Sequence, residues 1–167
     1  MDKAKRPTVS NKPEWLGSRE GISDEVLPPW VPIEVKRKCS KEEPHTFSVS
    51  CWGRIYEFAA SPFPVNVVTK NRTILADSIR MTARVDGRLQ RWQGGSIELN
   101  EATDARACFS QRISSSTLRL SSEIKIEYDG LVRIDWRLEP LRPLRLEELT
   151  FEIPLDSKCA KYFYYFP

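Results

Sequence analysis

The side chains that most often carry catalysis or bind metals are few in this chain and widely spaced. His45 is the only histidine and follows Pro44 in a charged segment, so a histidine-based triad or metal centre has no second histidine to build on. The four cysteines form no Cys-x-x-Cys pair: Cys39, Cys51, Cys108 and Cys159. Their spacing predicts packed thiols rather than a zinc or redox site. We therefore expect no catalytic residue, no cofactor and no metal ligand.

Paired carboxylates are the one remaining route to hydrolysis, because two of them flanking a glycosidic bond can act as acid and base. Adjacent pairs occur at Glu42-Glu43 and Glu147-Glu148. Neighbours on a strand point to opposite faces, and a pair in a loop is usually solvated. Neither pair is expected to form a site. The sequence also lacks a phosphate-binding loop, a dinucleotide-binding glycine motif, a Gly-x-Ser-x-Gly elbow and a His-Glu-x-x-His motif.

Aromatic side chains are the residues that could contact a sugar or another domain. Their flat faces bury large apolar areas, whether in a core, at an interface or against a sugar ring. Residues 162–166 are five consecutive aromatics, and strand alternation buries only every second one. This end is predicted either to be a last strand or to pack on another domain. The candidate contact residues are Trp30, Trp52, Tyr162, Tyr164 and Phe166.

Composition excludes several functional classes. The chain has 167 residues with 40% hydrophobic and 29% charged residues, which suits one globular domain. Lys and Arg exceed Asp and Glu by 26 − 23 = 3, and the charges are dispersed, so nucleic acid is not an expected partner. Apolar runs are too short for a membrane helix. The basic start has no apolar stretch behind it, so the chain as written is expected in the cytoplasm.

Patterning along the chain predicts an all-β fold. Residues 1–26 are polar, carry no lasting periodicity and are predicted to be a disordered tail. A β-sandwich domain is predicted over residues 27–167, with the basic run 36–38 in a solvated loop and one helical turn near 100–106. Roughly ten alternating segments without crossover helices predict a two-layer, mostly antiparallel β-sandwich.

The clearest hairpin spans residues 118–138. A two-residue loop at Asp129-Gly130 would place Ile126 opposite Arg133, whereas a three-residue loop places Ile126 opposite Val132 and keeps all apolar side chains on one face. The second register requires a left-handed residue, which Gly130 can supply. In this register Trp136 lies on the apolar face, and we expect it to be buried.

Five segments in order carry a family resemblance: residues 27–32 (LPPWVP), 51–58 (CWGRIYEF), 127–135 (EYDGLVRID), 149–155 (LTFEIPL) and 160–162 (AKY). Together they resemble the N-terminal β-sandwich domain of glycoside hydrolases related to family 123, the β-N-acetylgalactosaminidase group. The resemblance covers about residues 27–167. In that family the sandwich precedes a (β/α) barrel, whose adjacent Asp-Glu pair catalyses hydrolysis of a 2-acetamido sugar.

The resemblance implies a fold and a supporting role, because the chain ends where the barrel would begin. It implies a non-catalytic accessory domain that buttresses a downstream barrel, with the chain as a fragment or a short stand-alone product. Family members are often secreted or periplasmic, which leaves localisation open. Two other readings remain: a stand-alone carbohydrate-binding module, which an exposed row of aromatics would favour, and a complete small hydrolase, which a cleft with two carboxylates would favour.

Overall fold

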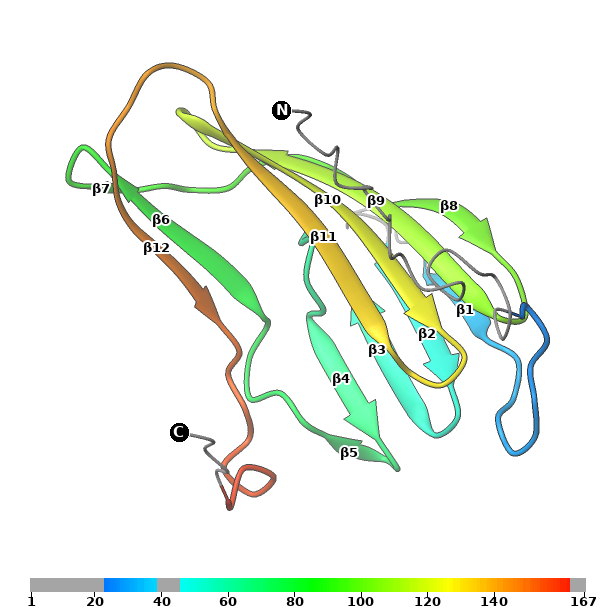
Figure 1. Cartoon of the computed structure of the whole chain (residues 1–167). Coiled ribbons are helices and arrows are strands. Elements are labelled where there is room, and N and C mark those ends of the chain that lie inside the picture. The colour runs from blue at the N-terminus through cyan, green and yellow to red at the C-terminus, as the bar shows by residue number, and fades with distance from the viewer. Residues whose placement is uncertain (1–22, 39–45, 163–167) are drawn as a thin grey trace, which may run out of the picture.

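The computed structural model describes residues 23–38 and 46–162, and in this part of the chain twelve strands form three antiparallel sheets (Figure 1). The five-stranded sheet has the order β1 (Glu34–Lys38), β2 (Thr46–Cys51), β3 (Arg54–Phe58), β4 (Asn66–Thr69), β5 (Arg72–Thr73). The four-stranded sheet has the order β11 (Val132–Pro140), β10 (Leu118–Glu127), β9 (Arg106–Ser114), β8 (Glu98–Ala102). The three-stranded sheet has the order β12 (Leu146–Glu152), β6 (Arg80–Val85), β7 (Arg88–Leu89).

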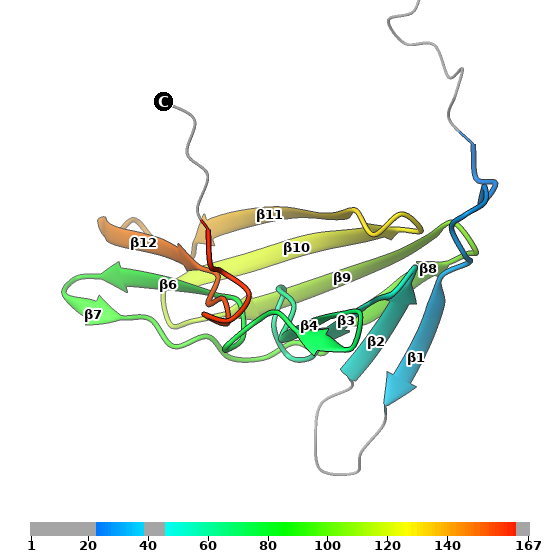
Figure 2. The ribbon, with the colours of Figure 1, turned by 90° about the horizontal axis from the view of Figure 1, so that it is seen from below.

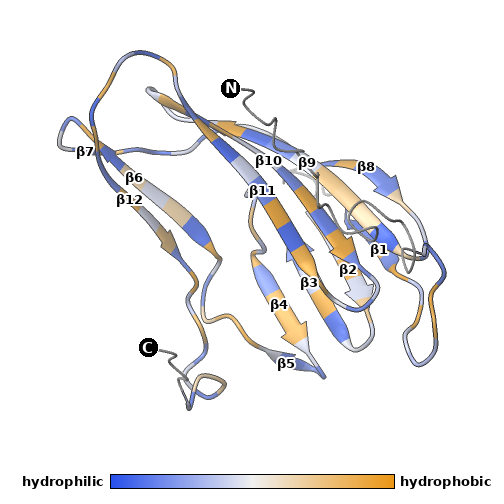
Figure 3. Cartoon of the chain, viewed as in Figure 1, coloured by the Kyte–Doolittle hydropathy of each residue, from blue (hydrophilic) through white to orange (hydrophobic). Residues whose placement is uncertain are grey.

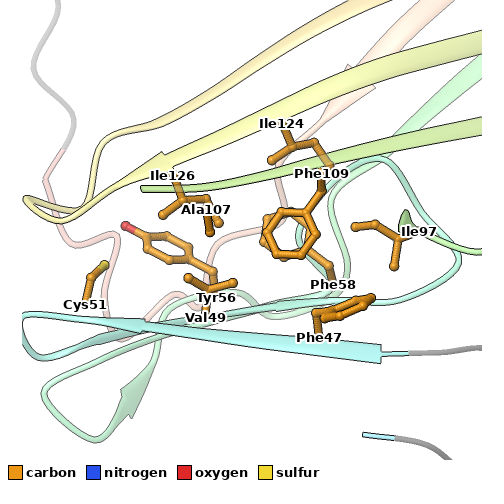
Figure 4. Close-up of a cluster of buried hydrophobic side chains, with 10 residues drawn as sticks. All are labelled: Phe47, Val49, Cys51, Tyr56, Phe58, Ile97, Ala107, Phe109, Ile124 and Ile126. Atoms are coloured by element: carbon orange, nitrogen blue, oxygen red, sulfur yellow. The ribbon is translucent and has the colours of Figure 1, made fainter. Parts of the chain in front are cut away.

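The four-stranded sheet forms one layer, and the other two sheets pack side by side on its inner face. At one end, Phe109 and Ile124 of the four-stranded sheet meet Phe58 of the five-stranded sheet (Figure 4). At the other end, Leu120 of β10 packs with Met81 of β6. Figure 2 shows the four-stranded sheet arching over β2 and β3. The predicted all-β, mostly antiparallel sandwich is confirmed, with one of its layers split into two sheets.

Burial alternates strictly along β10, so every second residue lies on its inner face. The hydropathy colouring alternates along most of this strand and is interrupted at residues 121–123 (Figure 3). Between the two apolar clusters lies one buried polar row, in which Ser122 is paired in register with Gln111. Gln111 donates from Nε2 to the carbonyl oxygen of Gly95 at 3.0 Å. Its Oε1 and the Ser122 Oγ are buried and have no hydrogen-bond partner in the described part of the chain. This row interrupts the apolar inner face of β10 between Leu120 and Ile124.

The predicted register of the β10–β11 hairpin is confirmed. Ile126 pairs with Val132. The turn is closed by a hydrogen bond from Gly130 N to the Glu127 carbonyl oxygen at 2.9 Å. Gly130 has φ +90°, a conformation that costs glycine little. The requirement that all apolar side chains lie on one face of the hairpin therefore predicted the correct turn.

Two local predictions differ from the structure, and one strand has no counterpart among the predictions. Residues 36–38 belong to the edge strand β1 rather than to a loop, and their lysine and arginine side chains suit an edge, because charge discourages pairing with other chains. Residues 100–102 end strand β8, so no helical turn forms there. Strand β9 was not anticipated, because its inward row contains the small Ala107 and the polar Gln111, which weaken the alternation.

Trp136 contradicts the expected burial. It lies in register opposite the buried Ser122, on the predicted face, yet 46% of its surface is exposed. The reason is that β11 is the edge of its sheet, where the opposite layer covers only part of the strand. Alternation predicted the correct face of the strand but not how far that face is covered.

The adjacent glycines Gly94 and Gly95 give a matched test of backbone packing. Both have positive φ, +90° and +74°. A Cβ on Gly94 would meet no atom within 4 Å, whereas one on Gly95 would lie 2.0 Å from the Arg112 carbonyl oxygen. We expect Gly94→Ala to cost about 1 kcal/mol of unfolding free energy from strain alone, and Gly95→Ala to cost about 3 kcal/mol or more. Urea denaturation of both variants measures this, and equal losses would contradict it.

The partial cover of Trp136 predicts a modest role in stability. Trp136→Ala should lower the unfolding free energy by about 1–2 kcal/mol, because roughly half of the side chain already contacts solvent. Phe109→Ala, in the centre of the core, should cost about 3–5 kcal/mol. Denaturant titrations of the two variants compare them directly. A Trp136→Ala loss as large as the Phe109→Ala loss would mean that Trp136 is buried in solution.

Candidate functional site

An exposed tryptophan stands at the tip of the β2–β3 hairpin. The two residues at this tip, Trp52 and Gly53, have φ +35° and +77°, the pattern of a type I′ turn. The first position of such a turn favours Asn, Asp or Gly, and a bulky residue there is strained by about 1–3 kcal/mol. Even so, 47% of the Trp52 surface remains exposed. Local backbone preference does not account for this residue.

Neighbouring aromatic rings support Trp52. The Trp30 ring lies with its centroid 6.1 Å from that of Trp52, at a 55° tilt. Trp30 also meets the edge of Tyr128 at 5.8 Å. The predicted candidates Trp30 and Trp52 are thus brought together, and Tyr128 links them to the β10–β11 turn.

Two hydrogen bonds join the layers beside this tip. Arg54 donates from Nη1 to the Asp129 carbonyl oxygen at 2.9 Å, and the Tyr56 hydroxyl donates to the Gly130 carbonyl oxygen at 2.8 Å. Burial raises the pKa of the Tyr56 hydroxyl, so it stays protonated and able to donate. Burial likewise raises the pKa of the nearby Cys51 thiol, which disfavours the reactive thiolate.

A groove of about 570 Å³ runs beside Trp52 on the outer face of the five-stranded sheet. Tyr56 points inward, so its neighbour Ile55 points outward, and Val68 lies beside Ile55 in register. We call this the Trp52 groove. Its lining combines an apolar floor with a polar rim and includes Val31, Pro32, Glu34, Ser50, Trp52, Ile55, Val68, Lys70 and Asn71.

The far side of the Trp52 groove is a second hairpin tip, formed by Lys70 and Asn71 between β4 and β5. Both residues have positive φ, +48° and +63°. The Lys70 amide donates to the Gly53 carbonyl oxygen at 2.9 Å, which fixes one tip against the other. Asn71 is the sequence signal for this turn, since Asn tolerates the left-handed region.

A separate apolar surface lies along β12. Phe151 pairs in register with the buried Met81 and packs on the Phe63 ring at 4.9 Å, so it belongs to the inner face. Yet Phe151 is 49% exposed and Ile153 is 52% exposed, because β12 is a sheet edge. We call this the β12 surface; its members are Leu149, Phe151, Ile153 and Leu155. The sequence predicted the strand but not that its apolar face would be left half-covered.

The outer face of the four-stranded sheet carries a polar groove of about 590 Å³. Glu123 and Asp135 lie opposite each other in register on this face. Arg133 pairs with Asp135 at 2.8 Å, and Arg137 pairs with Glu139 at 3.2 Å. Charges of both signs neutralise one another along this face, as in a solvated sheet surface.

The other predicted residues do not form a site in the described part of the chain. Glu147 accepts from the Gly87 amide at 3.0 Å and Glu148 pairs with Arg84 at 3.3 Å, so both secure the β6–β7 hairpin. Tyr162 is 96% exposed. Several candidates lie outside the described residues: Cys39, Glu42, Glu43, His45, Tyr164 and Phe166, together with residues 1–22 of the predicted tail.

Residues 23–38 and 46–162 contain neither a candidate metal site nor a candidate membrane helix. No group of three or more His, Cys, Asp or Glu side chains there could hold a metal ion. The same residues contain no helix with the length and apolarity needed to span a membrane. Cys51 is a buried free thiol, and Cys108 and Cys159 are half-buried free thiols.

The strain at Trp52 can be measured by two substitutions. Trp52→Asn relieves the backbone strain but loses the contact with Trp30, so we expect the unfolding free energy to change by less than about 1 kcal/mol. Trp52→Val loses the same contact and adds a β-branched residue that resists positive φ. Urea denaturation should find the Asn variant more stable than the Val variant by at least about 1 kcal/mol. Equal stabilities would show that the tip is not left-handed.

Comparison with known proteins gives one family. A family model described as "Glycoside hydrolase 123, third domain" matches residues 43–164, nearly three quarters of the chain. The predicted family resemblance is confirmed, although the description numbers the domain third, whereas the resemblance was drawn to an N-terminal domain. The chain matches no curated protein.

Proposed function

Because this chain belongs to the glycoside hydrolase 123 third-domain family, we propose that it is a non-catalytic accessory domain that packs against a catalytic (β/α) barrel. The β12 surface is the observation that carries the proposal. Apolar patches of this kind on a soluble domain usually mark an interface. The family description supports a neighbouring domain as the occupant, since the word third implies other domains in the same kind of protein.

The position of β12 at the edge of its sheet also supports the β12 surface as an interface. Strands β11 and β12 follow each other in the chain, yet each is the edge of a different sheet and they do not pair. An edge strand presents unpaired backbone groups that proteins normally cover or protect with charge. Edge strand β1 carries such charges. Strand β12 also carries three glutamates, but Phe151 and the adjoining Ile153 remain exposed beside them. A neighbouring domain seated on β12 would bury both the apolar side chains and the free edge.

Acid–base catalysis by this chain has little support among the described residues. A glycosidase acid needs a raised pKa so that it is protonated at working pH. The pKa of Glu57 is lowered by hydrogen bonds from Asn66 and Lys38, and the pKa of Asp77 is lowered by the Ser78 amide and Arg80. Both shifts run opposite to what a general acid requires, so neither Glu57 nor Asp77 suits that role.

The proposal is tested by binding between two separately purified proteins: this chain and the barrel domain of a glycoside hydrolase 123 protein. Sedimentation velocity should detect a complex. Ile153→Asp places a charge on the β12 surface without removing the Phe151–Phe63 contact, and it should weaken the complex by at least about tenfold, or about 1.4 kcal/mol.

The matched control is Leu89→Asp on β7, which is similarly exposed but lies on the opposite edge of the same sheet. It should leave the complex intact. Circular dichroism verifies that both variants fold. Absence of a complex with the unaltered chain, or equal binding by the Ile153→Asp variant, would refute the proposal.

A further inference from the structure

We propose that the Trp52 groove binds a pyranose ring, with the indole of Trp52 as the stacking surface. The site lies on the outer face of the five-stranded sheet and shares no residue with the β12 surface. Its volume of about 570 Å³ falls within the range of small-molecule sites.

The first argument is the residue at the tip. A type I′ turn would form more easily with Asn or Gly in place of Trp52, so the large ring is not there for the turn. Nor is it there to fill the core, since nearly half of its surface is exposed. Residues held in disfavoured conformations gather at ligand-binding sites. A ring that serves neither turn nor core is available for a ligand.

The second argument is the chemistry of the lining. Ile55 and Val68 give an apolar floor, and the rim offers both donors and acceptors. Lys70 and Asn71 supply N–H donors on one side. Glu34 supplies carboxylate oxygens on the other, and its charge is offset by Lys36 at 3.1 Å. A neutral ligand with one apolar face and a circumference of hydroxyl groups matches such a lining.

The third argument is preorganisation. The hydrogen bond from the Lys70 amide to Gly53 fixes the two hairpin tips that flank the groove, and Trp30 supports the Trp52 ring. A site built in advance spends little of its binding energy on ordering loops. The groove is thus held open by the fold itself.

An aromatic groove could also take a proline-rich peptide. The choice of a sugar rests on the proposed function, because a domain of a glycoside hydrolase works beside carbohydrate. Titration of the chain with free sugars contains no barrel domain. If no sugar binds, the proposal of a sugar site is refuted and the proposal of barrel docking is unaffected. If no barrel domain binds, the proposal of barrel docking is refuted and the sugar titration still tests the Trp52 groove.

The test is a two-dimensional ¹H–¹⁵N titration of the full chain with methyl β-D-glucopyranoside, methyl β-D-galactopyranoside and their 2-acetamido counterparts. We expect at least one of these sugars to give saturable shifts at the Trp52 indole N–H and at the Lys70 and Asn71 amides. Trp52→Asn should keep the fold and weaken binding by at least about tenfold.

The matched control is Asp86→Asn, which introduces the same residue at the positive-φ tip of the β6–β7 hairpin and should leave sugar binding unchanged. Three results would overturn the proposal. They are no saturable shift with any of the four sugars, unchanged binding by the folded Trp52→Asn variant, or shifts at these residues with a proline-rich peptide and not with sugars.

Discussion

The inner face of β10 is the surface on which the rest of the molecule depends. Its buried residues meet the five-stranded sheet at one end and the three-stranded sheet at the other. Ile124 contacts the five-stranded sheet, and Leu120, four residues earlier on the same strand, contacts the three-stranded sheet. The five-stranded and the three-stranded sheet each supply only one side of these buried contacts, and the four-stranded sheet supplies the other. The strict alternation of one strand therefore organises a core drawn from all three sheets.

The polar row at Ser122 and Gln111 interrupts the apolar face of β10 inside that core. Each unpartnered buried polar atom costs stability, and replacing it with an apolar group of similar shape is often favourable. The row also marks where the second layer changes from one sheet to another. Trp136, beside Ser122, lies at the open edge of this boundary. The partial exposure of Trp136 therefore follows from its place on the edge strand β11.

Sequence periodicity predicted the parts of the fold in which alternate side chains must lie on opposite faces of a strand. The β10–β11 register followed from keeping Ile126 opposite Val132, because a slip of one residue would reverse every side chain. Periodicity failed at β9, whose inward row is broken by Gln111. It also could not predict how far an edge strand is covered, which depends on the other layer and not on the strand itself. For that reason the exposure of Trp136 and Ile153 emerged only from the structure.

The candidate site likewise combines features that the sequence predicts with features that depend on the packing of distant segments. Trp30 and Trp52 could be selected from their types as possible contact residues, but their mutual contact depends on how the segment before β1 meets the β2–β3 tip. That tip is closed by contacts that cross between layers, including the Tyr56 hydroxyl on Gly130 and Arg54 on Asp129.

The β12 end has a free edge and an uncovered apolar face, in contrast to the closed tip. A rigid, closed end suits a small ligand, because little ordering is lost on binding. An open apolar edge suits a large partner, whose surface can complete the layer. The unequal closure of the two ends therefore gives a physical reason to assign the smaller ligand to the Trp52 groove and the larger one to β12.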